Sequence, residues 1–281
     1  MSYVLSCCST ADLSKEHFEK RDINYVCFHF YLDEAYYPDD LGQTMPFDKF
    51  YKAMEDGAMT KTSQVNVAEF EEYFESFLKE GKDILHVTLS SGISGTWQAL
   101  KLAMQDEPNV AVFDSKLAVG GVRFLVEEAR RYENEPLEVI VQKLDALVPR
   151  IVIAAIPEML DYLLAGGRLS RAGWMMGKLL AIHPVIGFID GKVSVVAKKR
   201  GMKASLQYLA DVVVEQQSDP QYGIIAAYTE NQGNIEQVIG MTDPEYQKQV
   251  KLYDNLTPSI ACHWGPNAFG YIFVKKAADR I

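Results

Sequence analysis

The sequence predicts an α/β protein in which an N-terminal, Rossmann-like domain with a parallel sheet is followed by a C-terminal α+β domain with an antiparallel sheet. In the first half, short β-branched segments alternate with amphipathic helical segments, and the apolar segments end in small polar turns, as in a doubly wound sheet. In the second half, Asp190-Gly191 lies between two apolar runs and predicts a tight hairpin. Pro149 marks the change between the two patterns, so we expect domains over residues 1–150 and 151–281.

In the first domain, strands and helices are expected to alternate along the chain. The expected strands cover residues 3–6, 23–31, 84–89 and 110–113, and the expected helices begin near Ser14 and cover residues 46–54, 66–80, 97–104, 122–132 and 136–148. The helix after Asn66 is the clearest, because Glu69 completes a capping box and aromatic residues follow at helical spacing. The stretch at residues 60–64 is polar and rich in hydroxyls, so we expect a loop there.

In the second domain, the expected elements mix hairpins with helices. Strands are expected over residues 151–156, 185–188, 193–197, 222–228, 259–263 and 271–274, and helices over residues 158–164, 172–180, 202–216 and 234–241. Gly166-Gly167 is expected to end the first of these helices, and His183-Pro184 the second. Because helices and hairpin strands are mixed in this way, we expect an antiparallel sheet.

Composition and charge argue against several classes of protein. The 281 residues are 48% hydrophobic and 23% charged, as in ordinary globular proteins, and the net charge of −10 argues against general nucleic-acid binding, which needs a basic face. No apolar run approaches the roughly 20 residues of a membrane helix, and the N-terminus lacks the pattern of a signal peptide. Cys7, Cys8, Cys27 and Cys262 show neither disulfide nor metal-ligand spacing. We therefore expect a cytoplasmic protein with no membrane span, metal or cofactor, and with inert cysteines.

The segment that most strongly indicates a binding site is the turn after the strand expected at residues 84–89. Residues 90–96, SSGISGT, bring small residues, hydroxyls and free backbone N–H groups to a helix start, which favours an anion. Because the carboxyl ends of parallel strands share one edge of a sheet, the turns at Ser9-Thr10 and Asp114-Ser115 are expected beside it. The loop expected at residues 60–64 is a further candidate for this edge.

Residues 92–96, GISGT, nearly match the hydrolase motif G-x-S-x-G, but Thr96 stands where the second glycine belongs. A hydrolase-like or phosphoryl-transfer enzyme that uses Ser94, His263 and an acid such as Asp114 is the alternative to a binding protein. However, five histidines and 38 acidic residues make such triples common. The structural interpretation of this motif is that Ser94 caps the helix that follows it. A P-loop is excluded, because the pattern G-x-x-x-x-G-K-[ST] is absent.

Three further features have both a structural and a functional interpretation. Gly166-Gly167-Arg168 is a helix end followed either by a solvated arginine or by an arginine held in a tight turn. The basic cluster at residues 198–203 is either a solvated face or a docking patch for an acidic or phosphorylated partner. His263, which precedes Trp264-Gly265-Pro266, is either a structural residue or part of a site at a strand end.

Taken together and in their order along the chain, these segments resemble the DegV family of bacterial fatty-acid-binding proteins, the partners of fatty acid kinases. The resemblance covers nearly the whole chain and lies in the segments STADL (residues 9–13), KTSQ (61–64), LSSGISGT (89–96), DS (114–115), YL through GGRLS (162–170), Pro184 and HWGP (263–266). The second, third and fifth segments together are specific to the family, whereas no single segment is.

The resemblance implies two domains with a long-chain fatty acid, such as palmitate, stearate or oleate, bound between them. It implies that the hydroxyls of Thr62 and Ser94 hydrogen-bond the carboxylate, and that His263, Gly95 and Gly265 belong to the fatty-acid-binding site. It also implies a lipid-binding protein rather than an enzyme. The resemblance further implies that family members with the right partner present the bound fatty acid to a separate kinase, which forms an acyl phosphate.

The residues themselves agree with this interpretation. A buried carboxylate needs hydrogen-bond donors, and two hydroxyls with N–H groups at a helix start supply them without a full positive charge. The acyl chain needs an apolar tunnel of about 20 Å for sixteen carbons, at roughly 0.8 kcal/mol per buried CH₂. Arg168, Arg171 and Arg200 are the candidates for contact with a phosphate or with the kinase.

Three positions depart from the family pattern. Cys8 stands where the family usually has Asp, Val65 stands where it has Pro, and His183 stands where many members have Lys. These positions lie outside the hydroxyl pair, so they bear on the kinase step more than on lipid binding.

Overall fold

The computed structural model describes residues 3–177, 182–252 and 256–277. By their contacts, the described residues form two compact units. The first lies within Met1–Pro46, Met59–Val148 and Asp190–Lys192, and the second lies within Phe47–Ala58, Pro149–Ile189 and Val193–Ile281. That residues 1–150 and 151–281 form two domains stays a prediction.

The first unit is built on a four-stranded parallel sheet in the order β2-β1-β6-β7. Its strands are β1 (Val4–Cys8), β2 (Asn24–Val26), β6 (Ile84–Thr88) and β7 (Val110–Asp114). Every residue of β1 and β6 is buried, which explains why these central strands are largely apolar rather than alternating. The predicted parallel sheet is therefore confirmed.

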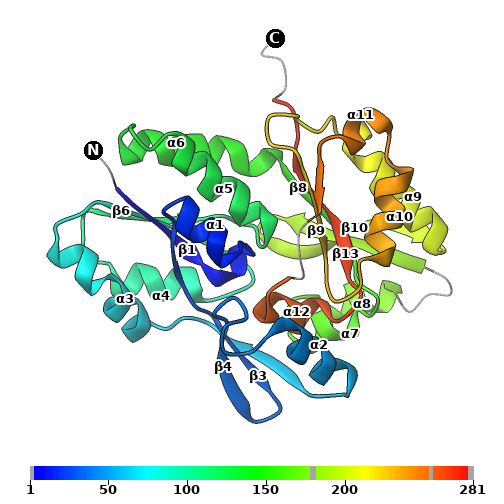
Figure 1. Ribbon diagram of the computed structural model, residues 1–281, viewed down its shortest axis with the longest axis horizontal. Helices are drawn as coiled ribbons and strands as arrows, with labels where there is room; N and C mark the ends of the chain where they lie inside the picture. The colour runs from blue at the N-terminus through cyan, green and yellow to red at the C-terminus, as the bar shows by residue number, and fades with distance from the viewer. Residues whose placement is uncertain (1–2, 178–181, 253–255, 278–281) are drawn as a thin grey trace. The chain divides into compact units, whose positions relative to one another are not determined.

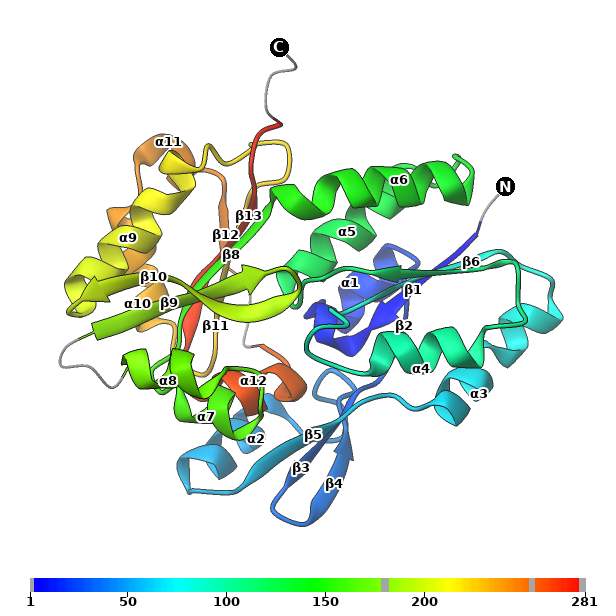
Figure 2. The ribbon, with the colours of Figure 1, turned by 180° about the vertical axis from the view of Figure 1, so that it is seen from behind.

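Helices connect these strands and cover both faces of the sheet. They are α1 (Lys15–Lys20), α3 (Val67–Lys79), α4 (Thr96–Ala103), α5 (Gly120–Arg131) and α6 (Leu137–Leu147), and a 3-10 turn, η1 (Ser9–Ala11), follows β1. Figures 1 and 2 show α3 and α4 on one side of the sheet and α5 and α6 on the other. The capping box of α3 is confirmed, because the Asn66 side chain accepts from the Glu69 N–H and the Glu69 carboxylate accepts from the Asn66 N–H.

A separate three-stranded antiparallel sheet, in the order β4-β3-β5, corrects two expectations. Its strands are β3 (His29–Leu32), β4 (Ala35–Pro38) and β5 (Thr60–Ser63). The single strand expected over residues 23–31 is wrong, because this segment contributes β2 to one sheet and β3 to another. The loop expected at residues 60–64 is mostly strand β5, in which Thr62 lies opposite Phe30 of β3. Hydroxyl-rich composition suggests a loop, but threonine also favours strands once a pairing partner is present.

The second unit contains a six-stranded mixed sheet in the order β10-β9-β8-β13-β11-β12. Its strands are β8 (Ile151–Ile156), β9 (Ile182–Ile189), β10 (Lys192–Arg200), β11 (Ile224–Tyr228), β12 (Val250–Leu252) and β13 (Phe269–Val274). β13 runs antiparallel to both β8 and β11, as predicted, whereas β12 is parallel to β11. Helices α9 (Met202–Glu215) and α10 (Gly233–Met241) share a core with this sheet that includes Leu209, Ile235 and Phe273.

Shorter helices complete the second unit and correct one predicted strand. They are α2 (Phe47–Glu55), α7 (Asp161–Ala165), α8 (Arg171–Gly177), α11 (Pro244–Gln247) and α12 (Pro258–Trp264), and a 3-10 turn, η2 (Val148–Arg150), precedes β8. The strand expected at residues 259–263 is wrong, because this segment lies in α12. Pro258 occupies the start of the helix, and Gly265 follows its last turn with a φ of 73°. Proline at the first position and glycine after the last are helix boundary signals, which here outweigh the apolar composition.

Two predicted boundaries near β9 also change. The helix expected at residues 172–180 corresponds to α8, and its residues 178–180 lie outside the described part of the chain. His183 and Pro184 belong to β9 rather than to the end of a helix. The hairpin turn is confirmed, because Asp190 and Gly191 both have positive φ angles, 49° and 78°, as the two central residues of a type I′ turn do.

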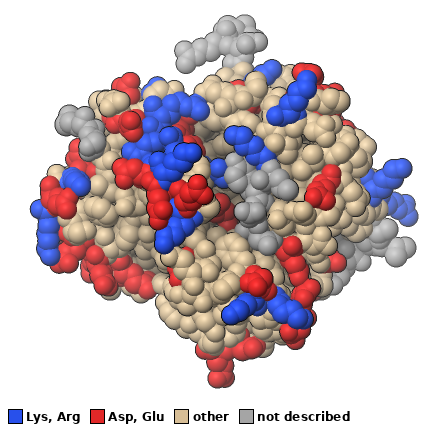
Figure 3. Space-filling model, viewed as in Figure 1, with Lys and Arg blue, Asp and Glu red and all other residues tan. Residues whose placement is uncertain are grey.

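The outer face drawn in Figure 3 carries acidic and basic side chains interspersed, without one dominant sign. This face therefore shows no broad basic surface of the kind that binds nucleic acid. No helix among the described residues has the length and apolar character needed to cross a membrane. Within the same part of the chain, no group of three or more His, Cys, Asp or Glu side chains is arranged to hold a metal ion.

Candidate functional site

The loop at residues 90–96 is tied to the end of the neighbouring strand β7. The Asp114 carboxylate accepts one hydrogen bond from the Ser91 N–H (3.0 Å) and another from the Ser91 hydroxyl (2.6 Å). The Ser90 N–H donates to the Leu117 carbonyl oxygen at 2.7 Å. The structure therefore brings together the two turns that were expected after β6 and β7 at the carboxyl edge of the parallel sheet.

The hairpin tip Asp190–Lys192, which belongs to the first unit, contacts the same loop. The Ser90 hydroxyl donates to the Gly191 carbonyl oxygen at 2.6 Å and accepts from the Gly92 N–H at 3.1 Å. Gly92 lies so close to the tip that a Cβ atom added to it would stand less than 3.0 Å from the Gly191 oxygen. The conformation of the loop thus depends on a backbone carbonyl about one hundred residues away in the sequence.

Most N–H groups of the loop are used inside the protein. Besides Ser91 and Gly92, the N–H groups of Ile93 and Ser94 both donate to the Ser90 carbonyl oxygen, at 3.2 and 3.3 Å. Among the described residues, the N–H of Gly95 has no acceptor. The expectation of several free N–H groups is therefore corrected, and hydroxyls are the main donors that the loop offers to a ligand.

Ser94 lies half-buried just before α4. Its Oγ atom is 2.9 Å from the Thr96 Oγ1 atom and accepts from the Thr96 N–H at 3.3 Å, as the helix-capping interpretation predicts. A serine nucleophile requires a general base within hydrogen-bond reach. Within the described part of the chain, the hydrogen bonds of Ser94 include neither a histidine nor a carboxylate.

Thr62 lies in β5 and is half-buried. The strand leads to Gln64, whose Oε1 atom lies less than 3.0 Å from the position that a Cβ atom on Gly95 would occupy. Thr62 precedes Gln64 by two residues and Ser94 precedes Gly95 by one, so their two segments meet in the structure. The roles of Thr62, Ser94 and Gly95 in holding a carboxylate stay predictions.

The turn at Ser9 and Thr10 is the 3-10 turn η1, and both residues are buried. The Ser9 hydroxyl accepts from the Phe28 N–H at 3.1 Å, so it holds the connection between β2 and β3. The Thr10 Oγ1 atom is buried and has no hydrogen-bond partner among the described residues. Ser9 therefore serves the fold of the first unit.

In the second unit, His263 lies in the last turn of α12 and packs against the turn after α7. A Cβ atom on Gly166 would stand less than 3.0 Å from the His263 Nδ1 atom, so only glycine fits there. Burial, and secondly the charge of Arg168, lower the pKa of His263 to about 4. The imidazole is therefore neutral at pH 7 and offers one donor and one acceptor.

Gly265 and Arg168 complete a cluster around His263. Gly265 has a φ of 73°, and a Cβ atom on it would stand less than 3.0 Å from the Tyr162 ring. Its carbonyl oxygen accepts from the Thr229 hydroxyl at 2.8 Å. The half-buried Arg168 guanidinium donates to the Gly166 carbonyl oxygen, within the turn after α7.

Arg171 and Arg200 lie at the ends of other elements. Arg171 begins α8 and Arg200 ends β10, and both are exposed. In the same basic cluster, the Lys199 Nζ atom lies 4.4 Å from the centroid of the Tyr208 ring. Contact of Arg168, Arg171 and Arg200 with a phosphate or a partner stays a prediction.

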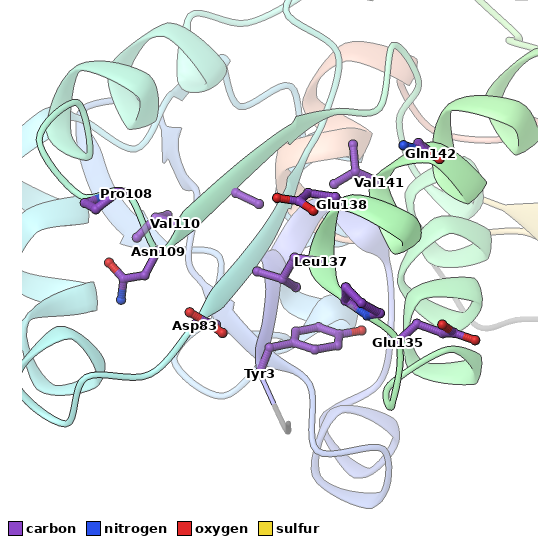
Figure 4. Close-up of a pocket in the computed structure, with 12 residues that line it drawn as sticks. Tyr3, Asp83, Pro108, Asn109, Val110, Glu135, Leu137, Glu138, Val141 and Gln142 are labelled. Atoms are coloured by element: carbon purple, nitrogen blue, oxygen red, sulfur yellow. The ribbon is translucent and has the colours of Figure 1, made fainter.

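A cavity of about 540 Å³ in the first unit lies at the other edge of the parallel sheet (Figure 4). Tyr3, Asp83 and Val110, at or next to the starts of three strands, contribute to its lining. Asp83, Glu135 and Glu138 add three carboxylates, and its lining includes neither lysine nor arginine. Like charges repel, so this cavity does not suit the carboxylate of a fatty acid.

For three residues that shape the loop, no local sequence pattern indicates a contact with it. The sequence marks Gln64 as part of a hydroxyl-rich stretch, Thr96 as a mismatch to a hydrolase motif, and Gly191 as a hairpin turn. Gln64 and Gly191 contact the loop across long sequence separations, and the importance of Thr96 depends on its complete burial. Only the glycines themselves, as residues that permit close approach, give a signal in the sequence.

Comparison with known proteins agrees with this architecture. Residues 8–276 match the family model described as "Uncharacterised protein, DegV family". A DegV domain-containing protein of Staphylococcus aureus (strain COL) is 30% identical over 275 residues, which cover 95% of this chain and 97% of the relative.

Solved structures share the fold over nearly their whole length. A fatty acid binding DegV family protein from Streptococcus agalactiae has a TM-score of 0.88 and 27% identity, over 99% of this chain and 100% of that chain. A stearic acid-binding protein from Eubacterium ventriosum has a TM-score of 0.84 and 25% identity, over 98% of both chains. The family match over residues 8–276 and these structural similarities show that the chain belongs to the DegV family.

Proposed function

We propose that this protein binds one long-chain fatty acid and that the hydroxyls of Thr62 and Ser94 hold its carboxylate. The observation that supports the site most directly is the contact between Gln64 and Gly95, since it joins the two segments that carry these hydroxyls. Fatty acid binding by the Streptococcus agalactiae relative and stearic acid binding by the Eubacterium ventriosum relative support the class of ligand.

The chemistry of the proposed site suits a carboxylate. Hydroxyl groups donate hydrogen bonds to the carboxylate oxygens but carry no positive charge. The head group is therefore held by hydrogen bonds, and no ion pair neutralises its negative charge. In the second unit, His263 is neutral at pH 7 because its pKa is about 4, so its imidazole offers a hydrogen bond rather than a charge. Burial of the acyl chain supplies most of the affinity, at roughly 0.8 kcal/mol per CH₂ group. Palmitate, stearate and oleate are the expected ligands.

Native mass spectrometry of the purified protein tests this proposal. The wild type is expected to carry one acyl chain, and the Thr62→Ala/Ser94→Ala double variant is expected to be largely empty. Ser76→Ala, on the exposed face of α3, is the matched control and should keep the full load. Equal loading of the double variant and the wild type would show that the hydroxyl assignment is wrong.

Covalent labelling of the purified protein tests the alternative, in which the protein is an enzyme that uses Ser94 and His263. A serine-reactive phosphonate is expected to leave Ser94 unlabelled, because the described hydrogen bonds of its hydroxyl involve Thr96 and no base. Peptide mapping after labelling provides the measurement. A stoichiometric adduct on Ser94 would favour the enzyme over the binding protein.

The finer part of the proposal is that a separate kinase phosphorylates the bound fatty acid. The carboxylate oxygen attacks the γ-phosphorus of ATP, ADP leaves, and an acyl phosphate forms. Arg171 and Arg200 are exposed and are proposed to contact the phosphate or the kinase. In an assay with an added fatty acid kinase, Arg171→Ala and Arg200→Ala should lower acyl phosphate formation but keep the lipid load. Lys20→Ala, another exposed cation, should change neither, and undiminished formation in both arginine variants would refute their role.

A further inference from the structure

The direction of one hydrogen bond sets the chemistry that Ser94 presents. A hydroxyl group has one hydrogen to donate and two lone pairs that accept. The Ser94 Oγ atom accepts from the Thr96 N–H at 3.3 Å and lies 2.9 Å from the Thr96 Oγ1 atom. Geometry alone permits either hydroxyl to donate in this second contact.

Burial of Thr96 decides between the two directions. Thr96 is 0% exposed, so its hydroxyl hydrogen has no access to water. Among the described residues, the Ser94 Oγ atom is the hydrogen-bond partner of the Thr96 hydroxyl. If Ser94 donated to Thr96, the Thr96 hydrogen would stay buried and unused, which costs about 1–3 kcal/mol. Donation from Thr96 to Ser94 avoids this cost.

When Thr96 donates to Ser94, the hydroxyl hydrogen is the only part of the Ser94 hydroxyl that a ligand can use. Both of its lone pairs are occupied, one by the Thr96 N–H and one by the Thr96 hydroxyl, while its own hydrogen stays available. Ser94 is half-buried, whereas Thr96 is fully buried, so the ligand meets Ser94 and not Thr96. A carboxylate accepts hydrogen bonds only, so it matches a donor with no free lone pair.

We propose that Thr96 is a positioning residue that orients the Ser94 hydroxyl as a donor and so selects a carboxylate over a neutral head group. This inference rests on the proposed fatty acid site and adds the residue that sets its selectivity. A fatty alcohol can accept the same hydrogen bond from Ser94, but it is uncharged and accepts more weakly than a carboxylate, and its own hydrogen finds no free lone pair on Ser94.

The rest of the loop keeps Ser94 from adjusting. Asp114 holds Ser91 through two hydrogen bonds, and the Gly191 carbonyl oxygen holds Ser90. The Ser94 N–H is itself bound to the Ser90 carbonyl oxygen. Because the backbone that leads to Ser94 is fixed in this way, the polarity of its hydroxyl is set by Thr96 rather than by movement of the loop.

Equilibrium binding of stearic acid and of stearyl alcohol to delipidated protein at pH 8 tests the proposal. Thr96→Val keeps the branched shape but removes the hydroxyl, and Thr96→Ser restores a hydroxyl. Thr96→Val is expected to weaken stearic acid binding roughly fivefold to tenfold, as for loss of one hydrogen-bonding partner, with less than about a twofold change for the alcohol. Thr96→Ser should bind stearic acid within about threefold of the wild type.

Three outcomes would overturn the proposal. Equal weakening of both ligands by Thr96→Val would mean that Thr96 serves only the fold, and unchanged stearic acid affinity would mean that it has no role. Failure of a correctly folded Thr96→Ser variant to restore acid binding would also contradict it, even if Thr96→Val proved unstable. A parallel Ser94→Ala variant separates the two proposals: unchanged acid affinity there refutes the carboxylate site itself, whereas a loss there with no effect of Thr96→Val refutes only the role of Thr96.

Discussion

His86, in the first unit, is a fully buried histidine that is neutral in the folded protein. The His86 ring lies edge-on to the Phe70 and Phe74 rings, and its two nitrogens lie 2.9 Å from the Ser6 hydroxyl and 3.5 Å from the Cys8 sulfur. Burial lowers the pKa of His86 to about 3. Cys8 thus has a neutral partner, and burial raises the pKa of its thiol above the usual range.

The pKa of His86 predicts how stability depends on pH. An unfolded histidine has a pKa of about 6.5, so below this pH the unfolded state binds a proton that folded His86 does not bind until about pH 3. The free energy of unfolding should therefore fall as the pH drops from about 6.5, with His86 contributing up to about 1.4 kcal/mol per pH unit. His86→Gln should show a shallower dependence in urea unfolding between pH 4.5 and 7. An unchanged slope in the variant would contradict this expectation, whatever the variant's overall stability.

A pair of carboxylates in the second unit predicts the opposite trend. Burial, and secondly a hydrogen bond with Glu55, raise the pKa of Glu230 to about 7. The folded state therefore holds a proton that the unfolded state releases above about pH 4.5, so this contribution to stability is full below pH 4.5 and is lost as the pH rises through 7. Glu230→Gln should raise the melting temperature relative to wild type at pH 8, with the difference vanishing at pH 5. Glu71→Gln, an exposed acid on α3, is the control, and a pH-independent difference for Glu230→Gln would argue against the shared proton.

At the scale of elements, the β9–β10 hairpin and the loop after β6 act together. Gly191 has a φ of 78°, and a Cβ atom on it would stand 2.7 Å from the Ser90 Oγ atom. Any other residue at position 191 would therefore meet both an unfavourable backbone conformation and the hydroxyl that holds the loop. The loop proposed to bind the carboxylate depends on this turn for its shape.

Gly191→Ala is expected to reduce the fatty acid load more than its effect on stability explains. Gly81→Ala is a matched control at the end of α3, because Gly81 has a similar φ of 65° but no atom within 4 Å of the added Cβ. Both variants should be destabilised by about 1 kcal/mol for the left-handed backbone, but only Gly191→Ala should lose lipid. Native mass spectrometry and thermal unfolding provide the two readouts. Equal lipid loads in the two variants would show that the hairpin tip has no effect on ligand binding.

For the whole molecule, ligand binding and stability are linked. A ligand that binds only the folded state stabilises it by RT ln(1 + [L]/Kd), which is about 2.7 kcal/mol at one hundred times Kd. Delipidated wild type should therefore unfold several degrees below the same protein with added stearic acid, and Thr62→Ala/Ser94→Ala should show a much smaller shift. Scanning calorimetry measures both proteins, with stearyl alcohol as the control ligand. A shift of equal size in the double variant would contradict the assignment of these hydroxyls.

Features that depend on short stretches of sequence were predicted well. The capping box of α3, the turn at Asp190-Gly191 and the strands β6 and β8 follow from local spacing and side-chain shape. The alternation of strands and helices around the parallel sheet also followed, because parallel strands need a helical crossover between them. The family resemblance rested on the same short segments, and the match over residues 8–276 confirms it.

Features that depend on a distant partner were not predictable in this way. Residues Thr60–Ser63 become a strand because β3 pairs with them, and the Ser90 hydroxyl meets the Gly191 carbonyl oxygen across 101 residues. The sequence by itself determined which hydroxyls stand at which strand ends and helix starts, since local geometry is encoded locally. Only the tertiary structure decided that Thr96 is completely buried and Ser94 is not, because burial is set by everything packed around a residue. That difference in burial is the physical reason why Thr96 donates to Ser94.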